Sequence, residues 1–311
     1  MDISDTPPEA ERRPCALCGA DAPLKVRHVL PAFAFRWLRE TSATGYMRMA
    51  ATPNRRAQDG LKQPWLCGGC ETLFSGFETA FATKLFHPWH GDSTLRVPYG
   101  EWLLKFCVSV SWRVLRYYEQ RDGLPTFSDT QRAYVRQALA RWSDFLFGRV
   151  PHPSGFEQHL LPFDGVRSTT VDGLPDNINR YLRRGLDMDI ARTSTFAFTY
   201  AKLGRFMIFG FVQPPAMKWE GTKVHLREGV VAPREYVLPR ELMDYVNDRA
   251  RNYASVQARI SEAQHDKIES AALADMDRLM NSGTFEAMME DHRLFGEEAI
   301  LRKPRAPTQG E

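Results

Sequence analysis

The stretch QPWLCGGCETLF, residues 63–74, sets two cysteines around two glycines, immediately before a sequence typical of a helix start. A second Cys-x-x-Cys pair, CALC, stands at residues 15–18, and Gly19 follows it. Glycine permits the sharp turns that direct backbone N–H groups toward sulfur. The pair in residues 67–70 also stands where a helix begins, and the positive end of a helix favours the thiolate.

Together the two pairs offer four thiolates, which is the complete tetrahedral ligand set of a structural zinc ion. We therefore predict a bound Zn²⁺ whose ligands are Cys15, Cys18, Cys67 and Cys70. A thioredoxin-like redox centre would need one such pair in a βα context, not two pairs. The fifth cysteine, Cys107, falls within an apolar helical pattern and is predicted to be an ordinary buried thiol.

The composition is that of an ordinary soluble globular protein. Apolar residues make up 43% of the 311 positions and charged residues 25%, which allows one large or two modest domains with a substantial core. The N-terminal segment has no apolar run that resembles a signal peptide, and no stretch reaches the roughly 18 apolar residues of a membrane span. We therefore expect a cytoplasmic protein without membrane contact, in which spaced cysteines indicate metal more than disulfides.

The charge pattern favours no class of partner strongly. The net charge of +3 and the pI near 8.6 are mildly basic, below the level that alone would indicate nucleic-acid binding. The segment NRYLRRGLDMDIAR, residues 179–192, gathers several arginines. Arg180, Arg183 and Arg184 are predicted to contact a phosphate backbone, with a solvated helix face as the alternative.

Pattern changes along the chain divide it into four segments. The Pro-rich, charged ends, residues 1–12 and 302–311, are predicted to be disordered tails. Residues 13–95 hold four of the five cysteines and form the predicted zinc-binding module. Residues 96–301 form a predicted body of helices and strands, so the fold class is α+β.

Within the body, apolar residues at helical spacing predict a helix over 101–120 and a second one over 129–148, begun by Asp129 or Thr130. Residues 150–178 carry several Pro and Gly and are predicted to be an irregular connection. Aromatic and β-branched residues in 193–213 predict two strands on either side of a tight turn, and 222–231 could supply a third. Residues 239–282 are a long helical pattern with room for one break.

One resemblance is specific. RHVLP (residues 27–31), followed much later by LCGGCE (66–71), resembles the Asp-His-Ile-x-Pro and Leu-Cys-x-x-Cys-Asn signatures of zinc-containing HNH endonucleases. It is still more similar to a bacterial HNH-like group with Ser-His-x-x-Pro and Cys-x-x-Cys-Glu, in which a QDGLK stretch, here residues 58–62, precedes the second cysteine pair. The likeness covers residues 15 to about 90, and the body resembles no family.

The resemblance implies a ββα-metal fold on a treble-clef scaffold, followed by a mainly helical body with a small antiparallel β-hairpin or meander. It implies that His28 is the general base of phosphodiester hydrolysis and that Glu71 binds a catalytic Mg²⁺ or Mn²⁺. Arg27 stands where the family usually has an acidic metal ligand, and an arginine there could hold a phosphate. For the family's middle asparagine, the nearby candidates are Asn54, Gln58 and Asp59.

These positions also have purely structural interpretations. His28 could cap a strand, and a glutamate in a first helical turn is favoured by the helix dipole. Glu78 lies two turns beyond Glu71, so it is predicted to be solvated or to form a salt bridge. His87 and His90 have ligand-like spacing but are predicted to be structural. An apolar stripe predicted to lie in the core comprises Phe74, Phe77, Phe81 and Leu85.

The leading hypothesis is an HNH-like endonuclease or nuclease-derived protein that acts on DNA or RNA by metal-assisted hydrolysis. The first alternative is a non-catalytic zinc protein that binds nucleic acid. The second is a protein-interaction factor in which the zinc is purely structural. Absence of the P-loop and nucleophile-elbow patterns argues against a P-loop enzyme or an α/β-hydrolase. The sequence leaves the oligomeric state open.

Overall fold

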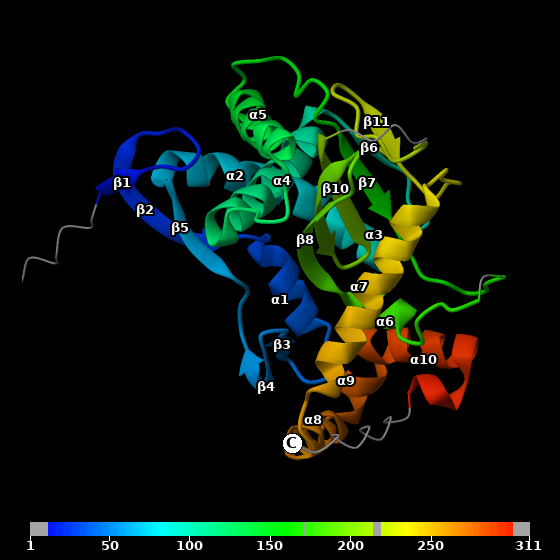
Figure 1. Cartoon of the computed structure of the whole chain (residues 1–311). Coiled ribbons are helices and arrows are strands. Elements are labelled where there is room, and N and C mark those ends of the chain that lie inside the picture. Colours follow the sequence, from blue (N-terminus) through cyan, green and yellow to red (C-terminus); the bar gives the residue numbers. More distant parts are fainter. Residues whose placement is uncertain (1–11, 171, 214–218, 301–311) are drawn as a thin grey trace, which may run out of the picture.

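The computed structural model describes residues 12–170, 172–213 and 219–300. Figure 1 shows a small N-terminal sheet and a larger body sheet, with helix α4 lying between them. The two predicted tails lie outside the described residues, except that Arg12 begins the first strand. None of the helices in the described part of the chain is long and apolar enough to cross a membrane.

The three antiparallel strands of the N-terminal sheet, in the order β1–β2–β5, are β1 (Arg12–Pro14), β2 (Asp21–His28) and β5 (Lys62–Cys67). β5 runs directly into α2 (Gly68–Phe81), which continues through a π-helical turn (Ala82–Phe86) into α3 (His87–Gly91). The two cysteine pairs lie at the ends of strands of this sheet, one in the turn between β1 and β2 and the other where β5 meets α2. Of the predicted apolar stripe, Phe74, Phe81 and Leu85 are at most 1% exposed, whereas Phe77 is only partly buried against the core.

Two elements are inserted between β2 and β5. Helix α1 (Ala32–Glu40) follows Pro31, and a hairpin follows the helix, formed by β3 (Met47–Met49) and β4 (Thr52–Ala57). The inward face of α1 is strongly apolar, with Phe33, Phe35 and Trp37 buried. These elements fill the long spacer between the cysteine pairs.

The two predicted body helices are confirmed as α4 (Glu101–Asp122) and α5 (Asp129–Leu146). Helix α5 begins at Asp129, one of the two predicted starts, and Ser128 is its N-cap. Its hydroxyl accepts a hydrogen bond from the N–H of Gln131 (3.2 Å), and the Gln131 side chain accepts one from the N–H of Ser128 (3.3 Å). This reciprocal capping box satisfies two donors that a helix start otherwise leaves free.

The body sheet is larger than the predicted hairpin or meander. Its four antiparallel strands, in the order β7–β10–β9–β8, are β7 (Gln158–Pro162), β8 (Leu186–Arg192), β9 (Ala197–Leu203) and β10 (Phe206–Gln213). The predicted tight turn joins β9 to β10 at Gly204, which has φ +56°. Strand β7 falls in the predicted irregular connection, and that prediction was wrong there. All five of its residues are buried, so it has no alternating pattern to reveal it.

The C-terminal part is mainly helical. Residues 239–282 contain two helix breaks where one was allowed for, at Arg259–Ser261 and at Ala274–Asp275. Of the predicted third strand, only β11 is regular, and it pairs with β6 rather than with the body sheet. The remaining elements are β6 (Val97–Tyr99), α6 (Ile178–Arg184), β11 (Gly229–Val231), α7 (Arg240–Ala258), α8 (Glu262–Leu273), α9 (Met276–Met280), α10 (Gly283–Phe295) and a 3₁₀ turn (Glu297–Ala299).

One hydrophobic cluster contains residues of both predicted segments, 13–95 and 96–301. Phe81 of α2 stacks on Phe106 of α4, with ring centroids 3.8 Å apart, and packs edge-on against Phe206 of β10 at 5.4 Å. Cys107 is fully buried within this cluster, as predicted, and burial raises the pKa of its thiol. The N-terminal sheet and the body therefore share a core.

Candidate metal centre and the adjoining histidine site

The four cysteines of the two pairs meet in space. Their Sγ atoms, from Cys15, Cys18, Cys67 and Cys70, all lie within 4.8 Å of one another. Cys15 and Cys70 are buried, and the backbone N–H of Cys67 donates to the Sγ of Cys15 at 3.3 Å. Four thiolates in a closed, largely buried site suit a structural Zn²⁺. Among the residues that the structure describes, no other group of three or more potential ligands comes this close together.

Backbone hydrogen bonds prepare one of these thiols for ionisation. Burial acts to raise the pKa of Cys15, but the backbone N–H groups of Cys18 and Cys67 outweigh it and bring the pKa to about 7. Burial raises the pKa of Cys70, which receives no such compensation. A cation at the centre would supply the positive charge that all four thiolates need, so metal binding and correct folding are coupled here.

His28 is the last residue of β2 and lies near the first cysteine pair in the sequence. Its ring Nε2 is hydrogen-bonded to Oδ1 of Asp59. Asp59 also accepts from the backbone N–H of Gly60 at 3.1 Å and from Nζ of Lys62 at 2.5 Å. Burial acts to raise the pKa of Asp59, but Lys62 and His28 outweigh it, so the pKa lies below its usual value. Asp59 is therefore a carboxylate at neutral pH and accepts the Nε2 proton.

This contact fixes the tautomer of His28. With the proton on Nε2, the lone pair is on Nδ1. Within the described ranges, Nδ1 of His28 has no hydrogen-bonding partner. Nδ1, the nitrogen that can accept a proton, is therefore the one without a hydrogen-bonding partner among the described residues.

The position of Asp59 depends on helix α1. The ring of Phe35 packs against His28 with centroids 5.6 Å apart. The same ring lies so close to Gly60 that a Cβ there would be 2.0 Å from Cζ of Phe35. Only glycine allows this approach. The Phe35 ring therefore packs against both His28 and the loop that carries Asp59.

Glu71 lies in the first turn of α2 and forms an ion pair with Arg27, whose Nε is 3.3 Å from Oε1. Burial raises the pKa of Glu71, against the opposing charges of Arg27 and Arg113. Among the described residues, neither Glu71 nor His28 belongs to a group of three or more metal ligands.

Arg113 of α4 ties this region to the body. Its Nη1 binds Oε1 of Glu78 at 2.5 Å and donates to the carbonyl oxygen of His28 at 3.4 Å. Of the two alternatives predicted for Glu78, solvation or a salt bridge, the structure shows the salt bridge. Because Arg113 is 5% exposed, it acts as an internal tie between α2, the end of β2 and α4.

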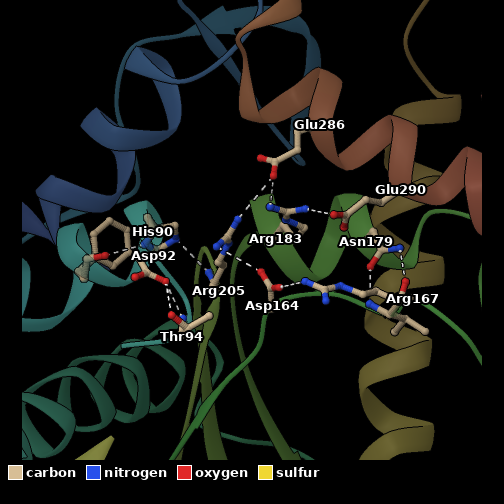
Figure 2. Close-up of polar contacts among 12 residues, drawn as sticks. His90, Asp92, Thr94, Asp164, Arg167, Asn179, Arg183, Arg205, Glu286 and Glu290 are labelled. Atoms are coloured by element: carbon tan, nitrogen blue, oxygen red, sulfur yellow. Dashed lines mark hydrogen bonds and ion pairs between the residues drawn. The ribbon is translucent and has the colours of Figure 1, made fainter. Parts of the chain in front are cut away.

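The arginines of α6 are occupied inside the protein. Arg183 is 4% exposed and binds Glu286 (2.5 Å) and Glu290, both of α10. Figure 2 shows this cluster, in which Arg205 reaches Asp164 at 3.2 Å. Contact of Arg183 with a phosphate backbone would require α10 to move away.

The other two α6 arginines are similarly engaged. Arg184, which is 7% exposed, donates to Oγ1 of Thr41 at 2.6 Å and to the carbonyl oxygen of Leu38 at 3.0 Å. Nε of Arg180 binds the fully buried carboxylate of Asp291 at 2.8 Å. The sequence pattern could not distinguish these internal contacts from a solvated or nucleic-acid-binding face, because the partner groups are distant in the sequence.

His90 has the structural role that was predicted. Its Nδ1 donates to the carbonyl oxygen of Phe86 at 2.7 Å, and its Nε2 accepts from the backbone N–H of Arg205 at 3.2 Å (Figure 2). Burial lowers the pKa of His90 to about 3. The neutral ring therefore joins α3 to the turn between β9 and β10.

Sequence reasoning named His28, and it named Asp59 only as one of three candidates for the middle asparagine of the HNH signature. It did not pair the two residues, and it missed Phe35 and Lys62. The QDG stretch was the available signal for Asp59, because an acidic residue followed by glycine marks a special loop. Comparisons of the chain with known protein families, with curated proteins and with solved structures find no match.

Proposed function

We propose that the N-terminal part of this protein is an HNH-like, treble-clef zinc module that hydrolyses phosphodiester bonds in DNA or RNA. The arrangement of elements supports the treble clef: a cysteine turn between β1 and β2, the β2–β5 pair, and a helix that begins at the second cysteine pair. The observation that carries the proposal is the His28–Asp59 pair, in which a carboxylate holds the imidazole with one nitrogen free.

The chemistry follows from that pair. Nδ1 of His28 takes a proton from a water molecule, and the water oxygen attacks the phosphorus atom. The bond from phosphorus to the leaving oxygen breaks, and that oxygen takes a proton from solvent. Asp59 holds the ring in one tautomer and stabilises the imidazolium as it forms, as a carboxylate does beside other catalytic histidines.

Arg27 and Glu71 supply the second part of the site. Arg27 is 57% exposed at its side chain and lies one residue from His28, so it can bind a phosphate oxygen without leaving the surface. In enzymes that the sequence resembles, a divalent cation stabilises the leaving oxygen. Here Glu71 already pairs with Arg27, so the mechanism assigns no step to such an ion, and Glu71 stays a candidate ligand only.

The test compares wild type with His28→Ala and Asp59→Asn in nicking of supercoiled plasmid and cleavage of labelled RNA. Assays contain Mg²⁺, Mn²⁺ or EDTA. A positioned general base contributes about a hundred- to ten-thousand-fold in rate, so we expect His28→Ala to lose activity on that scale. Zinc content and melting temperature should stay near the wild-type values. His152→Ala, at an exposed histidine, is the control and should cleave normally.

A non-catalytic, nucleic-acid-binding role is the second candidate, and the Arg27–Glu71 ion pair favours it. An arginine that neutralises the only acidic residue in the first turn of α2 would serve phosphate binding better than cation binding. Salt-sensitive binding without cleavage under any of the three metal conditions would select this candidate. If His28→Ala strips the zinc, the histidine is structural and the catalytic proposal is wrong.

A further inference from the structure

Three exposed arginines lie in the elements inserted between β2 and β5, and we call them together the hairpin surface: Arg36 of α1 with Arg55 and Arg56 of β4. In the described part of the chain, none of the three has a carboxylate within salt-bridge distance. The guanidinium of Arg56 lies over the ring of Tyr46, 4.1 Å from its centroid. That contact holds the side chain while its charge stays exposed.

The surrounding charge is mostly positive. Residues 41–58 contain three arginines and no acidic residue. Residues 12–91 carry eleven Lys and Arg against five Asp and Glu, although the whole chain has a net charge of only +3. Positive charge is therefore concentrated in the N-terminal part, while arginines of the body, such as Arg183 and Arg249, are paired with carboxylates.

The hairpin surface is within reach of the histidine site. Asp59 follows Arg56 by three residues, which span at most about 11 Å. Nη1 of Arg39 donates to Oε1 of Gln58 at 2.7 Å, so α1 is joined to the loop that carries Asp59. A chain of phosphates that passes His28 would continue over Arg55 and Arg56.

The C-terminal helices hold the hairpin in place. Asn54 donates to the carbonyl oxygen of Arg259 at 3.2 Å and accepts from the N–H of Ser261 at 2.7 Å. Arg259 in turn donates to the carbonyl oxygen of Ala50 at 3.0 Å. Figure 1 shows this hairpin beside the start of α8. The arginines are thus presented on a supported element, which lowers the entropy lost on binding.

From these observations we infer that the hairpin surface binds the phosphate backbone of the nucleic acid and guides it to His28. The inference rests on the proposed function and names the surface that the substrate crosses. Contacts to phosphate carry no sequence information, so this surface gives affinity and orientation but not base preference. The contact belongs to Arg36, Arg55 and Arg56 in place of the buried arginines of α6.

The experiment measures binding of a labelled 20-base-pair DNA duplex and a 20-nucleotide single strand by fluorescence anisotropy, from 50 to 200 mM salt. Each lost phosphate contact lowers the slope of log affinity against log salt by about 0.9 for duplex and 0.7 for single strands. We expect Arg55→Gln/Arg56→Gln to lower this slope by about 1.8 for the duplex and by about 1.4 for the single strand. The matched control, Arg136→Gln/Arg293→Gln, removes the same charge from two exposed helix positions and should keep the wild-type slope.

Two results would overturn the inference in different ways. If wild type binds nucleic acid and the Arg55→Gln/Arg56→Gln variant has the same salt slope, the hairpin surface is not the binding site. The proposed function would then still stand. Absence of wild-type binding to both nucleic acids at 50 mM salt would overturn both. Binding to phosphatidylserine vesicles alone would also overturn both, because it would identify an anionic membrane as the partner.

Discussion

The absence of a side chain at Gly60 determines where Asp59 lies. Gly60 packs directly on Phe35, and the same ring supports His28. The catalytic proposal therefore depends on a residue that has no functional group. Sequence reading identified the QDG stretch by resemblance, but the reason for its glycine is a contact with Phe35, 25 positions earlier in the chain, which local pattern cannot show.

Gly60→Ala should displace the loop, because the new Cβ would lie 2.0 Å from the Phe35 ring. Overpacking of this kind typically costs about 1–3 kcal/mol, and cleavage should fall because Asp59 leaves His28. Denaturant unfolding and the cleavage assay are the measurements. Gly76→Ala is the control, because its Cβ meets nothing within 4 Å on α2, and it should stabilise the protein by up to about 1 kcal/mol. Equal stability and activity of Gly60→Ala and wild type would contradict this account.

His90 should stay neutral from pH 8 to pH 5, because burial lowers its pKa to about 3. The unfolded chain takes up this proton below its ordinary pKa, near 6.5, whereas the folded protein does not. Folding stability should therefore fall on acidification by about 1.4 kcal/mol per pH unit from this group alone, between about pH 6.5 and pH 3.

The measurement is an NMR titration of the imidazole Cε1–H signal of His90, assigned by its absence in His90→Gln. We expect no inflection above pH 5. A normal titration midpoint near 6.5 would show that the ring is accessible to protons, and the buried hydrogen bonds to Phe86 and Arg205 would then be wrong.

At the scale of elements, what the sequence predicted depends on whether the signal is local. The cysteine pairs, α4, α5 and the β9–β10 turn each have their pattern within the element itself, and each was predicted. Strand β7 has no alternation because both of its faces are buried. The exact start of α5 required the side-chain geometry of Ser128, since Ser, Asp and Thr are all good caps and stand next to one another there.

The element with the most direct test is the start of α2. Cys67→Ser should lower the zinc content from about one ion per chain to near zero, because a structural zinc site needs its full set of thiolates. Folding should fail with it, since metal binding contributes directly to stability. Metal analysis and limited proteolysis measure both effects. Cys107→Ala is the control: it removes a buried thiol outside the site and should keep its zinc. Folded, soluble wild type without metal would refute the zinc site.

At the scale of the whole molecule, α6 links elements that are distant in the sequence. Its arginines reach α1 through Arg184 and α10 through Arg180 and Arg183. The groups of α1 and α10 that these arginines contact lie more than 100 residues away in the sequence, so composition alone suggested a phosphate-binding face. Helix α6, whose sequence suggested a nucleic-acid-binding surface, instead connects α1 and α10 inside the protein. The exposed positive charge lies on the hairpin surface.

Asp291→Ala should release α10. Asp291 is fully buried and accepts from Arg180 Nε at 2.8 Å and from the N–H of Asn179 at 2.7 Å. Removing one partner of a buried ion pair typically costs about 3–5 kcal/mol. Hydrogen exchange should show loss of protection in α6 and α10 while the zinc content is unchanged. Asp244→Ala, at an exposed carboxylate, is the control. Unchanged protection in α10 would show that this pair does not hold the helix.

The packing of Phe81 against Phe106 and Phe206 has a consequence for synthesis on the ribosome. The cysteine ligands have all emerged once residue 70 is clear, so the nascent chain can take up its metal early. The aromatic face of α2, however, is covered only in part by Phe106 of α4 until β10 is made. At about 5–20 residues per second, the 125 residues from Phe81 to Phe206 take roughly 6 to 25 seconds. Throughout that interval the growing chain exposes part of the aromatic face of α2. We therefore expect a chaperone that binds aromatic segments to interact with the nascent chain.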